Sequence, residues 1–185
     1  MSVSFLDAIR LVQDIAVRHG FRVALIGGFA LPFHGVRRAT GDVDFLVEAT
    51  GADALHAVLL TSSYQALHRS IDAANYRAAT GSLTSVDLLY ARRAPAVAML
   101  ERAGVHTGPS GFSVRVVDPE GIIGLKLQAI ANDPTRRRQD EADIVALMAA
   151  QLPALRHDLL AEYFALFDRS DALAEFLAEA RAGRA

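Results

Sequence analysis

Two aspartates one residue apart, Asp42 and Asp44, stand at the start of an apolar run. In a strand, residues i and i+2 point to the same face, so the two carboxylates would project side by side, close enough to share a divalent cation. Mg²⁺ prefers oxygen ligands and usually keeps waters and substrate phosphates in its remaining positions. The glycine pair Gly27 and Gly28 lies shortly upstream, where glycine lets a phosphate approach the backbone closely. This pattern predicts a site for a metal-bound nucleoside triphosphate.

A third carboxylate, Asp87, lies inside the apolar segment from Ser85 to Leu89. A lone aspartate in an apolar strand is costly to bury unless it is paired or binds a metal. Two metal ions bridged by carboxylates stabilise the attacking and leaving oxygens of an in-line displacement, which requires a third carboxylate near the first two. We therefore expect Asp42, Asp44 and Asp87 to bind metal. The alternative for Asp87 is a strand end that faces water.

The glycine pair and the acidic pair belong to one longer pattern, made of Gly27, Gly28, Ala30, Leu31, His34, Gly35, Arg38, Thr40, Asp42 and Asp44. A second, downstream block consists of Lys126, Ala129, Arg138, Asp140 and Asp143. The first block resembles the nucleotidyltransferase superfamily, whose hallmark is Gly-Gly or Gly-Ser, a short helix and then Asp-x-Asp. Both blocks in this order are most similar to AbiEii-type proteins, the toxin half of bacterial toxin–antitoxin pairs.

The resemblance implies a nucleotidyltransferase that uses a nucleoside triphosphate (NTP) as substrate, with two Mg²⁺ ions in the active complex. Asp42 and Asp44 are then metal ligands, and Asp87 is the third ligand or the base for the acceptor hydroxyl. Gly27 and Gly28 would bind the triphosphate through backbone N–H groups at the start of the short helix, whose dipole favours anions. Many members carry serine where this chain has Gly28, so their phosphate-binding hydroxyl is absent here.

Lys126 lies on an otherwise apolar helix face, where a lysine requires an anion such as a triphosphate. Asp140 and Asp143 are three residues apart and therefore share one face of a helix. The resemblance implies that one of them completes the active site, by orienting Lys126 or by assisting the acceptor. The alternative is a surface carboxylate that pairs with Arg136 or Arg137.

Arg38 and Thr40 directly precede the acidic pair. They are candidates to reach a phosphate or to fix the loop, and Arg37 is a further candidate. The alternative for Arg38 is a surface salt bridge, because most adjacent arginines are simply solvated.

The apolar patterns predict an α/β (α+β) fold: a small mixed β-sheet with a polymerase-beta-like nucleotidyltransferase core, flanked by helices, and a C-terminal helical bundle. We expect a core at residues 1–118 and a helical region at 119–185. The expected strands are Arg22–Ile26, Val43–Val47, Tyr64–Ile71, Tyr76–Ala79, Leu83–Tyr90 and, at the edge, Phe112–Val117. The expected helices run from a Ser4 cap to Gly20, over Gly28–His34, Ala52–Leu60 and Ala94–Ala103, from an Asp118 cap, and over Thr135–Arg181. A hairpin is expected about Gly81-Ser82.

The bulk composition limits the other possibilities. The chain has 185 residues, 52% of them hydrophobic, with no cysteine and a formal net charge of −2. The lack of cysteine rules out disulfides and thiolate zinc sites. The near-neutral charge gives no global electrostatic argument for nucleic acid. Neither a secretory signal nor an uninterrupted apolar stretch of about 18 residues is found, so we expect a cytoplasmic protein without a membrane span.

Three functions are compatible with these residues. The first is transfer of a nucleoside monophosphate (NMP) from an NTP to a hydroxyl on RNA, such as tRNA, or on protein, in a toxin with a cognate antitoxin. The second is a small-molecule, aminoglycoside-like adenylyltransferase that uses the same site. The third is a catalytically silent domain that binds a nucleotide or a partner.

Overall fold

The structure is a computed structural model that describes residues 5–79, 84–108 and 111–183. The predicted cap Ser4 and the predicted turn Gly81-Ser82 lie outside these residues.

The chain forms two compact units, each of which is described separately below. Unit 1 contains residues 1–30 and 38–117, and unit 2 contains residues 31–37 and 118–185. The seven-residue segment 31–37 is thus an excursion from unit 1 into unit 2, and the chain passes between the units three times.

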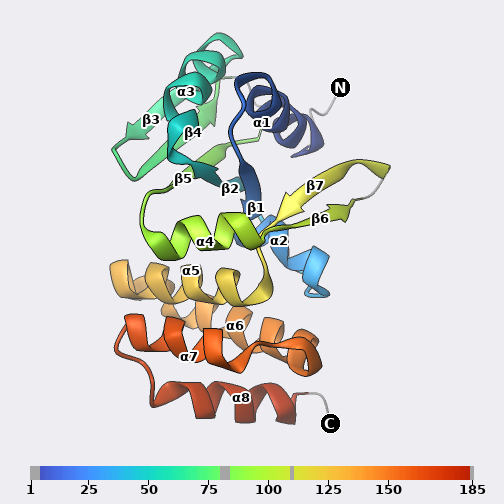
Figure 1. The fold of residues 1–185 in the computed structure, drawn as a ribbon, viewed down its shortest axis with the longest axis vertical. Coiled ribbons are helices and arrows are strands. Elements are labelled where there is room, and N and C mark those ends of the chain that lie inside the picture. The colour runs from blue at the N-terminus through green and yellow to red at the C-terminus, as the bar shows by residue number, and fades with distance from the viewer. Residues whose placement is uncertain (1–4, 80–83, 109–110, 184–185) are drawn as a thin grey trace. The chain divides into compact units, whose positions relative to one another are not determined.

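Unit 1 is built on a mixed sheet, which confirms the predicted fold class (Figure 1). Within the described residues it has seven strands in the order β3-β4-β5-β2-β1-β7-β6. The strands are β1 (Val23–Ile26), β2 (Val43–Glu48), β3 (Tyr64–Arg69), β4 (Ala73–Ala78), β5 (Val86–Ala91), β6 (Gly104–Thr107) and β7 (Ser113–Val116). Two neighbouring pairs, β2 with β5 and β1 with β7, run parallel, and the other neighbours run antiparallel. All four residues of β1 are buried, as its continuous apolar sequence predicts for a strand covered on both faces.

The helices of unit 1 cover both faces of this sheet. They are α1 (Phe5–His19), α2 (Gly27–Ala30), α3 (Ala52–Thr61), which follows the short 3-10 turn η2 (Ala49–Gly51), and α4 (Ala94–Arg102). α1 buries one stripe at helical spacing, from Ala8 to Ala16, and ends before Gly20, whose φ of +72° suits glycine. Figure 1 shows α3 and α4 on opposite sides of the sheet, with α4 against β2 and β5.

Unit 2 is helical. It contains the 3-10 turn η1 (Leu31–His34), α5 (Pro119–Asn132), η4 (Pro134–Arg136), α6 (Arg137–Gln151), η5 (Leu152–Ala154), α7 (His157–Leu166) and α8 (Ala172–Ala182). α5 packs against α6 and α7, and α8 packs against the same two helices. The predicted start of α5 is confirmed, because the Asp118 Oδ1 atom accepts a hydrogen bond from the Gly121 N–H at 2.8 Å and Pro119 takes the first helical position.

One ion-pair cluster ties the start of α7 to the start of α5. The Nη2 atom of Arg156 donates to Asp118 Oδ2 at 2.6 Å and to Glu120 Oε2 at 2.8 Å. The Arg156 backbone N–H also donates to Glu120 Oε1 at 2.8 Å, so the buried Glu120 carboxylate is satisfied at both oxygens.

The prediction that the last strand lies at the sheet edge was wrong. β7 lies between β1 and β6, and β6 forms that edge. The sequence analysis missed β6 because its four residues include a glycine and carry the exposed Val105, so no alternation marks them as a strand.

Across the described residues, we find no helix that combines the length and the apolarity needed to cross a bilayer.

Candidate active site

Asp44 and Asp87 lie side by side on the two parallel strands at the centre of the sheet. They are register partners in the β2–β5 pair, so their side chains leave the same face of the sheet. The next strands on either side place Ile26 of β1 beside Asp44 and Asn75 of β4 beside Asp87. One row across four strands therefore reads Ile26, Asp44, Asp87, Asn75.

The aspartates face away from α3. His56 of α3 contacts Tyr76 of β4 through a 2.9 Å hydrogen bond between Nδ1 and the hydroxyl, and Tyr76 is the register partner of Val86. Because side chains alternate along β5, Asp87 points to the opposite face from Val86. This leaves the aspartates on the side of the sheet where α4 lies (Figure 1).

The carboxylate of Asp44 leaves no room for a side chain at position 27, so this residue has to be glycine. Its φ is +62°, and a Cβ atom placed there would lie 2.0 Å from Asp44 Oδ2. A side chain at position 27 would therefore occupy the position of the Asp44 carboxylate. The glycine is required both by its backbone conformation and by this close approach.

The side chain of Thr40 restricts position 28 in the same way, because it leaves no room for a Cβ atom there. A Cβ atom at position 28 would lie 2.8 Å from the Thr40 Cβ and 2.9 Å from its Oγ1. The Thr40 hydroxyl also lies 3.5 Å from the backbone oxygen of Asp42. Unit 1 thus brings Gly27, Gly28, Thr40, Asp42, Asp44 and Asp87 to the same end of β2 and β5.

Asp42 directly precedes β2 and is exposed, whereas Asp44 and Asp87 are half-buried. In the described part of the chain, no three carboxylate or imidazole groups are arranged to hold a metal. The chemistry of the donors nevertheless fits a hard divalent cation, because two adjacent carboxylates on one sheet face offer only oxygen ligands. A metal there would be held by Asp44 and Asp87, with Asp42 as the flanking carboxylate.

Unit 2 contains the second group of predicted residues, and they form a buried ion cluster. Lys126 Nζ on α5 donates to Asp140 Oδ1 at 2.8 Å and to Asp143 Oδ2 at 2.5 Å, both on α6. Asp140 also accepts from Arg136 Nε at 3.1 Å. Lys126 and both aspartates are at most 8% exposed. A lysine on this face was predicted to require an anion, and two carboxylates of the chain itself supply the negative charge.

The two predicted arginines fall in different units. Arg37, which is exposed, ends the excursion into unit 2, and the half-buried Arg38 begins the return to unit 1. The sequence analysis missed Asn75, whose position beside Asp87 depends on the β4–β5 register. No local signal in the sequence sets that register.

Comparison with known proteins gives a likeness of fold. No family model and no curated protein sequence matches the chain. Among solved structures, the antibiotic-resistance factor ANT(2'')-Ia is similar with a TM-score of 0.64 at 17% identity, over 95% of this chain and 97% of that one.

Two further structures are similar. A lincosamide antibiotic adenylyltransferase, LnuA, solved with lincomycin bound, has a TM-score of 0.53 at 12% identity over 80% of this chain and 98% of that one. An antigenic nucleotidyltransferase-like protein from Paracoccidioides brasiliensis has a TM-score of 0.57 at 17% identity over 94% of this chain and 91% of that one. The chain therefore has the polymerase-beta-like nucleotidyltransferase fold.

Proposed function

We propose that the protein is a magnesium-dependent nucleotidyltransferase that moves NMP from an NTP to an acceptor hydroxyl. The observation that carries this proposal is the register pair Asp44–Asp87, with Gly27 packed against the carboxylate of Asp44. A pair of carboxylates beside a glycine turn, on a sheet of this fold, suits a metal-chelated triphosphate.

The reaction has a simple balance. The acceptor oxygen forms a bond to the α-phosphorus, the bond from that phosphorus to the oxygen bridging to the β-phosphorus breaks, and pyrophosphate leaves. The hydroxyl proton passes to a carboxylate, for which Asp87 is the candidate. Bound Mg²⁺ would polarise the phosphoryl oxygens and neutralise the charge on the leaving group.

The residues of the chain bind and orient the nucleotide. Asp42 and Asp44 would hold the metal, with Asp87 as the third ligand or as the base, and the backbone N–H groups of Gly27 and Gly28 would donate hydrogen bonds to the phosphate oxygens. Thr40 and Arg38 would lie beside the phosphate groups of the nucleotide. For Lys126, the proposal that it contacts the triphosphate is based on the resemblance to AbiEii-type proteins, and Asp140 and Asp143 would orient it.

Two acceptor classes are in competition. The AbiEii-type resemblance favours a hydroxyl on RNA, such as tRNA, or on protein, in a toxin controlled by an antitoxin. The likeness to ANT(2'')-Ia and LnuA, which extends over nearly the whole of both of those chains, favours a small polar molecule such as an antibiotic. Two arginines that would serve an RNA, Arg136 and Arg137, pair with Asp140 and Glu141 but stay more than half exposed, so these pairs do not decide between the two classes.

One labelling experiment separates these possibilities. The purified protein is incubated with each α-³²P-labelled NTP, Mg²⁺ and either total RNA, total protein, aminoglycosides or lincosamides. We expect label on one acceptor class, and no label with the Asp44→Asn variant. Label on RNA or protein selects the toxin-type reaction, and label on a drug selects the small-molecule reaction. Absence of transfer together with absence of Mg²⁺–NTP binding would leave a silent partner-binding domain and refute the proposal.

A further inference from the structure

A pocket with a volume of about 440 Å³ opens in unit 1, apart from Asp44 and Asp87. Its lining comes from three segments: the start of α3 with the preceding η2 turn, the end of β3 with the turn after it, and the residue that follows β5. The lining residues are Ala49, Ala52, Asp53, Arg69, Ser70, Ile71 and Arg92. The volume is in the range of small-molecule binding sites.

Asp44 and Asp87 lie near the start of β2 and β5, and the pocket lies at the opposite end of these two strands. β2 and β5 are parallel and in register, and Ala49 and Arg92 directly follow their last residues. The stretch of β2 from Asp44 to Glu48 alone spans roughly 13 Å at about 3.3 Å per residue. A ligand in the pocket is therefore bound separately from a metal held by Asp44 and Asp87.

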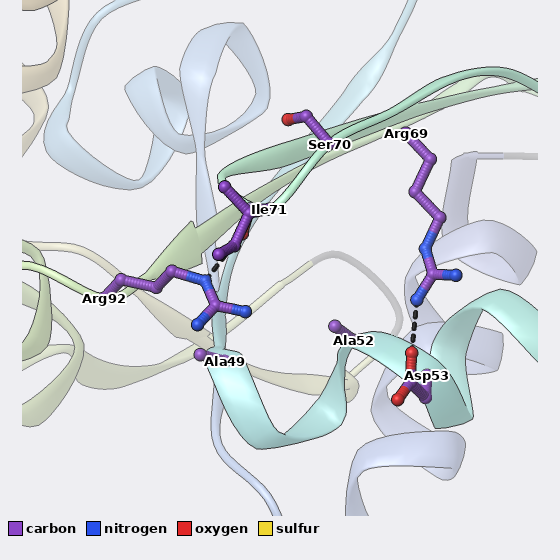
Figure 2. A pocket seen from close by; sticks show the side chains of 7 residues that line it. All are labelled: Ala49, Ala52, Asp53, Arg69, Ser70, Ile71 and Arg92. Carbon is purple, nitrogen blue, oxygen red and sulfur yellow. Dashed lines mark hydrogen bonds and ion pairs between the residues drawn. The ribbon is translucent and has the colours of Figure 1, made fainter.

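Two guanidinium groups dominate the chemistry of this pocket. Figure 2 shows Arg69 and Arg92 reaching from the sheet side toward the segment that carries Ala49, Ala52 and Asp53. The two alanines have small side chains and leave the space in front of the guanidinium groups open. With Asp53 as the one acidic residue of the lining, its formal charge is +1.

Arg92 is held in place but has donors left over. Its Nε–H donates to the backbone oxygen of Ile71 at 2.6 Å, and within the described part of the chain this is its one hydrogen bond. A guanidinium carries five N–H donors, so the four on its terminal nitrogens are available.

The turn that supplies the Ile71 oxygen is itself fixed. The Ser70 hydroxyl accepts from the backbone N–H of Ala73 at 3.0 Å and donates to the Ala73 oxygen at 3.1 Å. Arg92 is thereby positioned before any ligand arrives, which lowers the entropy cost of binding.

Arg69 pairs with Asp53, and a bound anion would have to compete with that carboxylate for the Arg69 guanidinium group. Its Nη2 atom forms an ion pair with Asp53 Oδ1, and the Asp53 side chain is 94% exposed. An exposed ion pair is weak, so an anion of higher charge can replace Asp53 as the partner of Arg69.

We propose that this pocket binds a phosphate group through Arg69 and Arg92, at a site separate from Asp44 and Asp87. A phosphate offers several acceptor oxygens that match two guanidinium forks. The group can belong to inorganic phosphate, to pyrophosphate or to a phosphomonoester. This inference does not depend on the transferase activity.

The test is a titration of the full-length, ¹⁵N-labelled chain at low ionic strength, followed by amide chemical shifts. EDTA is present so that no metal links a phosphate to the aspartates. The probes are inorganic phosphate, pyrophosphate and AMP, and the tightest binder identifies the source of the group. We expect saturable shifts at Ala49, Asp53, Ile71 and Arg92.

Three variants make the test specific. Arg92→Ala should weaken binding about tenfold, the effect of losing a charge-assisted contact. Arg93→Ala is the matched control, since Arg93 is the exposed neighbour outside the pocket lining, and it should leave the affinity unchanged. Asp53→Asn removes the competing carboxylate and should tighten binding.

The proposal is overturned if no probe gives saturable shifts in the pocket, or if Arg92→Ala and Arg93→Ala weaken binding equally. An Asp53→Asn variant that binds no more tightly than the native chain would remove Arg69 from the site. Retention of transferase activity in Arg92→Ala would show that the two sites act independently.

Discussion

The Asp44 carboxylate occupies the space that any side chain at position 27 would need, at 2.0 Å from the site of a Cβ atom. Gly27 and Asp44 are thus mutually dependent, the first through its backbone and the second through its side chain. Any substitution at position 27 would therefore displace the side chain of Asp44, one of the proposed metal ligands.

Gly27→Ala is expected to destabilise the fold and to abolish Mg²⁺–NTP binding. A φ of +62° costs a residue with a Cβ about 1–2 kcal/mol, and displacement of Asp44 adds to this. Urea denaturation and nucleotide titration measure the two effects. Gly20→Ala is the control, because Gly20 has a similar φ of +72° and, apart from its chain neighbours, no described residue lies within 4 Å of its Cβ position. Equal effects of the two substitutions would contradict the clash with Asp44.

Asp87→Asn is expected to remove most of the stabilisation that Mg²⁺–NTP confers on the native chain. Ligand at about 100 times its Kd stabilises a folded protein by about 2.7 kcal/mol, and the variant loses the carboxylate that neighbours Asp44. Thermal unfolding with and without ligand measures the difference. The exposed Asp14 on α1 supplies the control, Asp14→Asn, which should keep the full shift. A native-like shift in Asp87→Asn would remove this residue from the metal site.

Lys126→Met is expected to destabilise the protein by about 3–5 kcal/mol, because it leaves Asp140 and Asp143 buried without the ammonium group. The triple variant Lys126→Met, Asp140→Asn, Asp143→Asn should recover much of the loss, since it leaves no buried unpaired charge and the Arg136 side chain, which loses its partner, is exposed. Chemical denaturation of both proteins makes the comparison. If the triple variant is the less stable one, then the cluster contributes through something other than charge pairing.

Glu48 is expected to make part of the stability depend on pH. The hydrogen bonds from Arg22 hold the pKa of Glu48 below its ordinary value of 4.5. A carboxyl whose pKa is lower in the folded state stabilises the fold above its unfolded pKa, and this contribution is lost as the pH falls through the folded value. The stability of the native chain should therefore fall below about pH 4.5 more steeply than that of Glu48→Gln.

Urea denaturation between pH 7 and pH 3 measures this difference. Glu175→Gln, at an exposed position of α8, is the control and should follow the native curve. Parallel curves for the native chain and Glu48→Gln would contradict the role of the Arg22 contact.

The parts of the fold that local patterns mark could be predicted from the sequence. The Asp118 cap, the acidic strand β2 and the turn at Gly27 all carry their signals within a few residues. β6 has no such signal, and the position of β7 inside the sheet depends on how distant strands pair.

The candidate site shows the same division. The sequence indicates that Asp42, Asp44 and Asp87 are unusual, because charged residues interrupt apolar runs. The sequence could not show that Asp44 and Asp87 share one register position or that Asn75 stands beside them, since a one-residue slip would turn a side chain to the other face. Nor could it show that Lys126 contacts both aspartates of α6 and not one.

The excursion of residues 31–37 into unit 2 has a consequence for how the protein can be divided. A fragment beginning at Asp118 would lack η1, whose His34 carbonyl oxygen accepts a hydrogen bond from Gln151 on α6 at 2.9 Å. Cleavage before Asp118 would leave the helical fragment without residues 31–37. The sheet fragment would keep these residues but would lack the helices they belong with in unit 2. Limited proteolysis should therefore yield no stable helical product.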